Sequence, residues 1–280
     1  MTLKGRERCK MEKLTMLVVT HKQVNIPIIE GYKPIVVGNS NVFYDDMYRD
    51  NTGDNISNKN ANYCELTALY WAWRNLNDVK YIGLSHYRRF FSNSFLSHKK
   101  SSFLSCKKIV SLLNKYEVIL PYPKGWFDTT VEEWFLCTDG KKEALEKLRL
   151  VVADLYPEYL NDYDETMNGY MASYFNMFVM SKELLDKYCK WLFSILFQLE
   201  KQVDLSGYTP LQARIYGFLS ERLLNVWVRH NRLKTKYMFV NEIEKNSSLK
   251  SEIKDILKYE IISKRYLNWM TLFKWGNMKK

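Results

Sequence analysis

The sequence predicts an α/β fold with a mixed central sheet, helices on both faces of the sheet, and a helical, basic C-terminal extension. Two observations predict it. Strand-like and helical segments alternate through the first two thirds of the chain, and 46% of its 280 residues are hydrophobic, enough for a sizeable core. This length fits one large domain, or one domain with an appendage.

The first elements are two strands and a helix. Residues 14–20 are a short apolar run rich in β-formers, and residues 32–38 read YKPIVVG, so both ranges are predicted strands. The polar residues 39–59 are predicted to be a loop. A helix is predicted over residues 61–75, because apolar side chains recur there at three- and four-residue spacing. They are Leu66, Leu69, Tyr70 and Trp73.

Strands and helices continue to alternate up to residue 180. Residues 79–84, 117–120 and 174–180 are predicted strands from their apolar, β-rich composition. Residues 106–115 and 143–155 are predicted helices from their apolar periodicity. Two long helices are then expected over residues 182–201 and 209–233.

The end of the chain is strongly basic. The net charge is +11, and residues 229–280 alone hold 13 Lys and Arg against 5 Asp and Glu. Residues 234–280 are predicted to be a basic amphipathic helical tail, separate from a catalytic domain over residues 14–233. Such a helix suits the surface of an anionic membrane. The alternative is a helix packed on the catalytic domain or on a partner subunit.

Composition also restricts location. No apolar run approaches the roughly 18 residues of a membrane span, and no apolar secretory segment opens the chain. Residues 1–13 are polar and basic and are predicted to be a flexible leader. The five cysteines form no Cys-x-x-Cys pair, which indicates reduced thiols and a cytoplasmic protein.

A basic cluster follows the predicted strand 79–84. In open α/β sheets, ligands bind at the carboxyl ends of the strands. His86, Arg88 and Arg89 stand at that end, and arginine forks bind phosphate oxygens without a metal. We therefore expect these three residues to bind a diphosphate. The alternative is a surface basic cluster with an incidental histidine.

Polar segments near other strand ends are candidate nucleotide contacts. The predicted contacts are Thr20, His21, Lys22, Asp54, Asn55 and Asn62. Asn62 and Glu65 also match a capping box at the start of the predicted helix, which would give both residues a structural role. Trp126 and Asp128 follow the strand 117–120 and are candidate sugar or acceptor contacts.

A carboxylate on the predicted helix 209–233 could act as general base. Arg214 and Glu221 fall on one side of this helix, and Arg214 and Arg222 flank the carboxylate, which favours its ionised form. Glu221 could then deprotonate an acceptor hydroxyl, with Arg214 contacting substrate. The alternative is a structural ion pair.

No sequence signature indicates a metal. The four histidines lack metal-ligand spacing, and G-x-S-x-G, Walker and H-E-x-x-H motifs are absent. Asp162-Tyr163-Asp164 is the single D-x-D-like string and is interpreted as part of a solvated loop, with metal binding as the alternative. No cofactor is therefore expected.

Four segments together resemble a bacterial family. Residues 62–73 (NYCELTALYWAW), 83–90 (GLSHYRRF), 174–180 (YFNMFVM) and 217–224 (GFLSERLL) are similar to a family long described as a domain of unknown function. Its members occur in capsular and exopolysaccharide synthesis and are regarded as glycosyltransferases, some of them galactofuranosyltransferases. The resemblance covers roughly residues 14–227.

The resemblance implies a GT-A-like, Rossmann-like fold. In that fold a D-x-D motif usually follows a central strand and holds a metal on the donor diphosphate, and here residues 85–88 (SHYR) take its place. The resemblance also implies that Asn176 contacts the donor sugar and that Glu221 is catalytic or binds acceptor, with His86 also in the catalytic set. Trp134 and Cys137 replace a Tyr and a His of the family pattern, a departure that bears on acceptor choice.

The expected function is hexosyl transfer from a UDP-linked nucleotide sugar, with galactofuranose or another hexose as the sugar. The expected acceptor is a lipid-linked capsular or exopolysaccharide repeat unit at the inner face of the plasma membrane, where the tail would bind peripherally. The alternative is a non-enzymatic basic protein that binds nucleic acid or another anionic polymer. No nucleic-acid-binding module is visible, so nucleic acid is not an expected partner of the enzyme.

Overall fold

The computed structural model describes residues 14–94, 100–125, 128–138 and 140–243. The predicted leader 1–13, the site candidate Trp126 and the tail beyond residue 243 lie outside the described residues.

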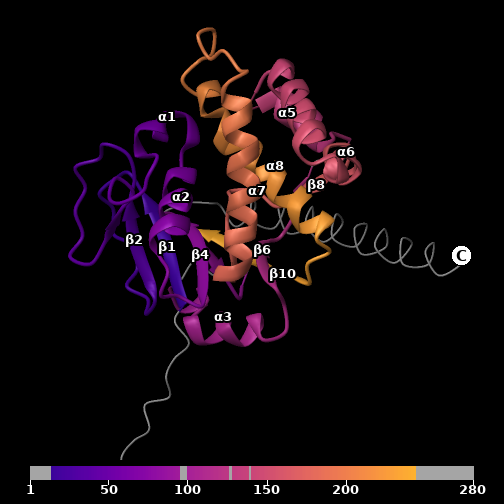
Figure 1. The fold of residues 1–280 in the computed structure, drawn as a ribbon. Coiled ribbons are helices and arrows are strands. Elements are labelled where there is room, and N and C mark those ends of the chain that lie inside the picture. The colour runs from indigo at the N-terminus through magenta and orange to yellow at the C-terminus, as the bar shows by residue number, and fades with distance from the viewer. Residues whose placement is uncertain (1–13, 95–99, 126–127, 139, 244–280) are drawn as a thin grey trace, which may run out of the picture.

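An eight-stranded mixed sheet forms the centre of the fold, as predicted, in the order β3-β2-β1-β4-β5-β10-β6-β9 (Figure 1). Strands β3, β2, β1 and β4 run parallel, and β9 pairs antiparallel with both β4 and β6. The strands are β1 Leu14–Thr20, β2 Tyr32–Val36, β3 Tyr48–Arg49, β4 Tyr81–His86, β5 Arg89–Ser92, β6 Val118–Pro121, β9 Phe178–Ser181 and β10 Thr235–Glu242. A separate small sheet pairs β7 Lys124–Gly125 with β8 Met171–Ala172.

Helices surround this sheet. The α-helices are α1 Asn60–Tyr63, α2 Leu66–Asn75, α3 Cys106–Leu113, α4 Val131–Thr138, α5 Lys142–Leu155, α6 Leu160–Met167, α7 Lys182–Glu200 and α8 Ile215–His230. Short 3-10 turns are η1 Ser57–Lys59, η2 Lys100–Ser102, η3 Pro157–Tyr159 and η4 Gln212–Arg214. None of the helices in these ranges has the length and apolar character needed to cross a bilayer.

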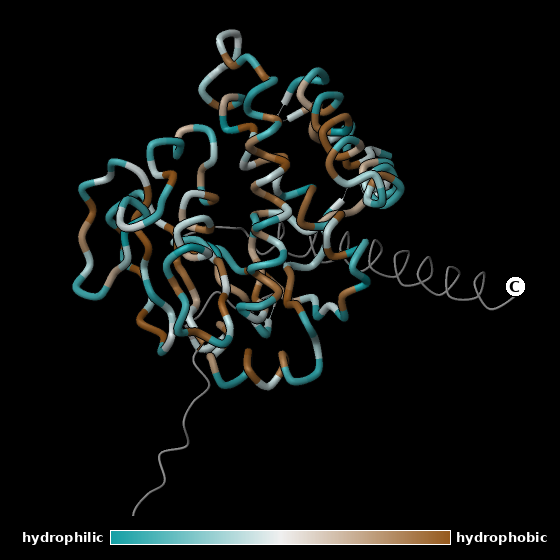
Figure 2. The backbone as a smooth tube through the Cα atoms, viewed as in Figure 1, coloured by the Kyte–Doolittle hydropathy of each residue, from teal (hydrophilic) through white to brown (hydrophobic). Residues whose placement is uncertain are grey.

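The main core lies where α2, α5, α7 and α8 meet one another and the sheet. Helix α7 begins at the N-cap Ser181, whose side chain accepts a hydrogen bond from the backbone N–H of Leu184. It then buries Leu185, Leu192 and Leu196 on one face. Brown and teal alternate along this helix in Figure 2, as expected for an element with one buried face. A second cluster on the other side of the sheet packs α3 through Ile109 and Leu113.

The predicted boundary between catalytic domain and tail is wrong. Residues 234–243 were expected to begin a helical tail, but residues 235–242 form β10, which pairs with β5 on one side and β6 on the other. In Figure 1 this last described strand lies within the sheet. The domain therefore extends at least to residue 242.

Three other predicted elements differ from the structure. The helix predicted over 61–75 is two helices, because Cys64 adopts a left-handed φ of 53° that interrupts it. The strand predicted over 174–180 begins only at Phe178, because Phe175 and Asn176 have φ values of 77° and 50°. The helix predicted from residue 209 begins at Ile215, after a 3-10 turn.

Candidate active site

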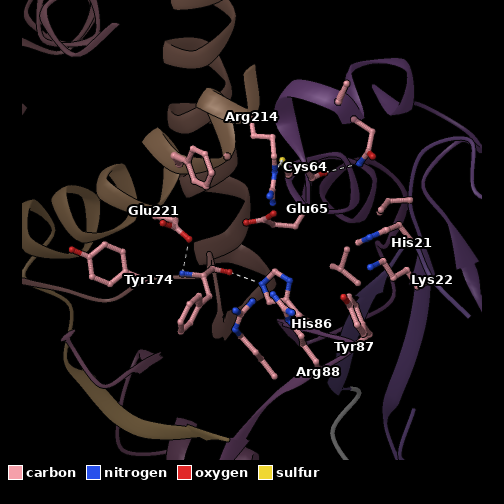
Figure 3. Close-up of a pocket in the computed structure, with 18 of the residues that line it drawn as sticks. His21, Lys22, Cys64, Glu65, His86, Tyr87, Arg88, Tyr174, Arg214 and Glu221 are labelled. Atoms are coloured by element: carbon pink, nitrogen blue, oxygen red, sulfur yellow. Dashed lines mark hydrogen bonds between the residues drawn. The ribbon is translucent and has the colours of Figure 1, made fainter. Parts of the chain in front are cut away.

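A cavity of about 880 Å³ opens at the carboxyl ends of the parallel strands β1, β2 and β4. His21 and Lys22 follow β1, Val37 follows β2, and His86 ends β4. The structure brings seven of the predicted site residues to its lining, several of them labelled in Figure 3. They are His21, Lys22, His86, Arg88, Arg89, Arg214 and Glu221.

A tight hairpin presents the basic cluster. His86 of β4 pairs with Arg89 of β5, so Tyr87 and Arg88 are the two turn residues between antiparallel strands. The backbone N–H of Tyr87 donates to the carbonyl of Val19 on the neighbouring strand β1, at 3.0 Å. The turn is therefore fixed to the sheet at the cavity edge.

The two arginines of this hairpin differ in their partners. Arg89 donates from Nε to the Glu242 carboxylate at 2.8 Å, and its guanidinium packs 4.3 Å from the Phe175 ring centroid. The exposed Arg88 side chain makes no hydrogen bond or ion pair with any described residue. Arg88 is thus available to a ligand, whereas much of the charge of Arg89 is balanced by Glu242.

His86 has a defined tautomer. Its Nε2 lies 2.6 Å from the carbonyl oxygen of Phe175, so Nε2 carries the proton and donates it (Figure 3). Burial lowers the pKa of His86, and Arg88 and Arg89 lower it further, while Glu65 and the Phe175 carbonyl oppose the shift. His86 is therefore neutral near pH 7. It offers Nδ1 as a hydrogen-bond acceptor rather than the cationic donor expected for a diphosphate.

A strained turn at Phe175 links two site residues. The Phe175 carbonyl accepts from His86, and the Phe175 N–H donates to Glu221 Oε1 at 2.7 Å. Phe175 and the next residue, Asn176, both have positive φ, which is uncommon outside glycine. One strained peptide segment therefore fixes the positions of a histidine and a carboxylate that both line the cavity.

Glu221 is engaged at both oxygens. Oε1 accepts from Phe175, and Oε2 accepts from Arg222 Nη1 at 3.1 Å. Arg222 has 0% exposure and also donates to the carbonyl of Phe218. The sequence placed Glu221 in the site, and the structure adds that its carboxylate is part of a buried ion pair.

A second carboxylate in the cavity is Glu65. The capping box expected at Asn62 and Glu65 does not form, because neither α1 nor α2 has a side-chain cap. Glu65 Oε1 instead accepts from Asn176 Nδ2 at 2.8 Å. Asn176 is 2% exposed and does not line the cavity, so the expected direct contact of Asn176 with a sugar is not what this geometry provides.

Arg214 bounds the cavity beside Glu65. Its Nε donates to the sulfur of Cys64 at 3.1 Å. Burial raises the pKa of the Cys64 thiol to about 11, so the thiol stays protonated. Burial also lowers the pKa of His21, with Lys22, Arg214 and Arg88 adding to this effect. Three cations of the site therefore all disfavour the protonated form of His21.

Besides Asn176, five predicted contacts do not line the cavity. Thr20 is buried and donates to the carbonyl of Lys22, and Asn62 donates to the carbonyl of Ala213. Asp54 pairs with Arg74 at 2.6 Å, and Asn55 bonds within its own turn. Asp128 accepts from Thr129. Where these side chains find their partners is a tertiary property that strand-end position alone does not specify.

The D-x-D-like string lies in a helix rather than in a solvated loop. Asp162 and Asp164 belong to α6, where Asp162 contacts His230 and Arg229, and Asp164 pairs with Arg149. Within the described ranges, no group of three or more His, Cys, Asp or Glu side chains could hold a metal ion. Metal independence of the chain stays a prediction.

Lys124, Cys64 and Phe175 line the cavity but were not predicted to do so. Lys124 lies 4.9 Å from the Phe175 ring centroid. It begins β7, three residues after β6 ends at Pro121, so the strand-end rule could have found it. No sequence signal marks the positive φ of Cys64 or Phe175.

Comparison with known proteins gives one family and one solved structure. The family model described as "Domain of unknown function (DUF4422)" matches residues 15–232. The apo structure of WbbM, described as a bifunctional glycosyltransferase, is 27% identical with a TM-score of 0.75. The match covers 84% of this chain and 46% of the WbbM chain, so this chain spans less than half of that protein. No curated protein matches.

Proposed function

This chain belongs to the DUF4422 family, and we propose that it is a glycosyltransferase that takes a sugar from a nucleotide-sugar donor. The observation that carries the proposal is the cationic cavity at the carboxyl ends of β1, β2 and β4. The fold of the chain is similar to that of a solved glycosyltransferase, which supports the same conclusion.

The charges of the cavity favour an anionic ligand. Five basic side chains line it, against the two carboxylates Glu65 and Glu221. The basic residues are Lys22, Arg88, Arg89, Lys124 and Arg214. A nucleoside diphosphate leaving group develops negative charge as the sugar departs, and fixed cations stabilise that charge. Arg88 is the first candidate for this role, because its guanidinium lies over the Tyr87 ring and forms no hydrogen bond or ion pair with a described residue.

The finer features of the reaction are part of the proposal. We assign UDP as the nucleotide, galactofuranose or another hexose as the sugar, and a lipid-linked capsular or exopolysaccharide repeat unit as the acceptor. Residues 62–73 and 83–90 resemble the bacterial family whose members occur in capsular and exopolysaccharide synthesis, and this resemblance supports these assignments. In this proposal cationic side chains replace a metal ion, so transfer persists in EDTA, and reversible loss of turnover on chelation contradicts metal independence.

Calorimetric titration with UDP tests the proposed site. We expect saturable binding by the wild type and at least about tenfold weaker binding by Arg88→Ala, because a hydrogen bond to a charged group contributes about 1.5–3 kcal/mol. Arg149→Ala is the matched control, since Arg149 lies on α5 and pairs with Asp164. Binding to DNA without binding to UDP would favour the basic binding protein instead.

A further inference from the structure

We propose that Glu65 is the catalytic base, the carboxylate that takes the proton from the acceptor hydroxyl, and that Asn176 is its positioning residue. The inference rests on the proposed function and names the residue that performs its chemical step. It replaces the expectation that Glu221 has this role.

The two carboxylates of the cavity differ in what holds them. Glu221 uses both oxygens, one on the N–H of Phe175 and one on the buried Arg222. Glu65 accepts at one oxygen from Asn176, and among the described residues its other oxygen has no hydrogen-bond donor. A general base needs an accessible lone pair within reach of the substrate proton. Glu65 provides one, whereas Glu221 is part of the framework.

The position of Glu65 suits a reacting group. It follows Cys64, whose left-handed conformation separates α1 from α2 and turns the chain at the cavity wall. In Figure 3 its side chain points into the space bounded by Arg214, Glu221 and His86. Both the diphosphate-binding cations and the neutral His86 therefore face the same space as the Glu65 carboxylate.

Asn176 is built to orient Glu65. Its side chain is 2% exposed and fully used: Nδ2 donates to Glu65 Oε1 and to the Gly217 carbonyl, and Oδ1 accepts from Ser220 Oγ at 2.9 Å. Its φ of 50° is a conformation that asparagine tolerates better than most residues. A buried amide fixed on three sides leaves Glu65 little freedom at the bonded oxygen.

The step balances as a single displacement. The acceptor O–H bond breaks and its proton passes to the Glu65 carboxylate. The acceptor oxygen forms a bond to the anomeric carbon, while the bond from that carbon to the diphosphate oxygen breaks. The electron pair leaves with the nucleoside diphosphate, which the cations of the cavity hold. Glu65 then releases its proton to solvent.

Steady-state kinetics of Glu65→Gln test the assignment. The assay measures UDP release from UDP-galactose, UDP-galactofuranose and UDP-glucose, with octyl β-galactoside or water as acceptor. We expect kcat to fall by about 10²- to 10⁴-fold, the range for loss of a general base, with UDP affinity within about threefold of wild type. The acidic limb of the pH–rate profile should disappear. Glu183→Gln, an exposed glutamate on α7 paired with Lys187, is the matched control with unchanged turnover.

Asn176→Asp provides a second test that does not remove Glu65. A carboxylate at this position would repel the Glu65 carboxylate, so the acidic limb of the pH–rate profile should move to higher pH while UDP affinity persists. An unshifted limb contradicts the positioning role. Near-wild-type turnover of Glu65→Gln contradicts the catalytic role while leaving the proposed function intact. Absence of UDP release by the wild type from every donor contradicts the proposed function itself.

Discussion

Arg222 is a fully buried charge whose partners fix one wall of the cavity. It donates to the Glu221 carboxylate and lies 5.1 Å and 5.2 Å from the ring centroids of Phe135 and Tyr174. Glu221 in turn accepts from the strained residue Phe175. Neither the burial of Arg222 nor the double engagement of Glu221 can be predicted from helix periodicity, which places the two residues side by side without identifying their partners.

Removal of Arg222 should therefore destabilise the protein strongly. We expect Arg222→Met to lower the free energy of unfolding by about 3–5 kcal/mol, because it removes the buried cation that pairs with the Glu221 carboxylate, which is 13% exposed. Urea denaturation measures this loss. The double variant Arg222→Met, Glu221→Gln should lose less than the sum of the two single variants, and strict additivity would show that the pair is not coupled.

The partly buried His86 should make stability depend on pH. Its folded pKa lies below the ordinary value of 6.5, so below pH 6.5 the unfolded chain binds a proton that the folded chain does not. Stability therefore falls as the pH drops from 6.5 toward the folded pKa. We expect the Tm to fall less between pH 7.5 and 5.5 in His86→Gln than in the wild type. His21→Gln, at an exposed position, should change this dependence less, and equal effects would contradict the burial argument.

At the scale of elements, apolar runs predicted most strands, but the sequence did not reveal where a predicted helix or strand is interrupted. Residues 14–20 were predicted in full as β1, because they form a short apolar run rich in β-formers. In the structure all five side chains from Met16 to Thr20 are buried. Strand β10 was missed, because only Met238 and Asn241 of its eight residues are buried and it precedes a basic segment. The breaks at Cys64 and Phe175 carry no Gly or Pro, so neither could be predicted.

Strand β10 determines how far the chain can be shortened from its C-terminal end and still fold. A chain ending at Leu233 lacks the strand that joins β5 to β6, so we expect it to lose the cooperative thermal transition. A chain ending at Asn246 should keep both that transition and UDP binding. If the tail is the proposed membrane anchor, this longer truncation also loses binding to phosphatidylserine vesicles. A folded chain ending at Leu233 would contradict the central role of β10.

At the scale of the whole molecule, the strand-end rule located the cavity and topology selected its residues. The rule predicts a ligand site at the carboxyl ends of β1 and β4. The cavity there is lined by His21, Lys22, His86 and Arg88. Glu65 reaches the same space from the start of α2, and Arg214 reaches it from η4. These contributions depend on how α2 and α8 pack, which apolar spacing on each helix does not determine.

UDP release from a panel of UDP-hexoses by the purified chain tests whether this cavity transfers a sugar. We expect turnover of at least one donor by the wild type, a large loss in Arg88→Ala, and no loss in Arg149→Ala, a control residue that does not line the cavity. Absence of turnover from every donor, or equal turnover by Arg88→Ala and wild type, would contradict the assignment of this cavity as the site of sugar transfer.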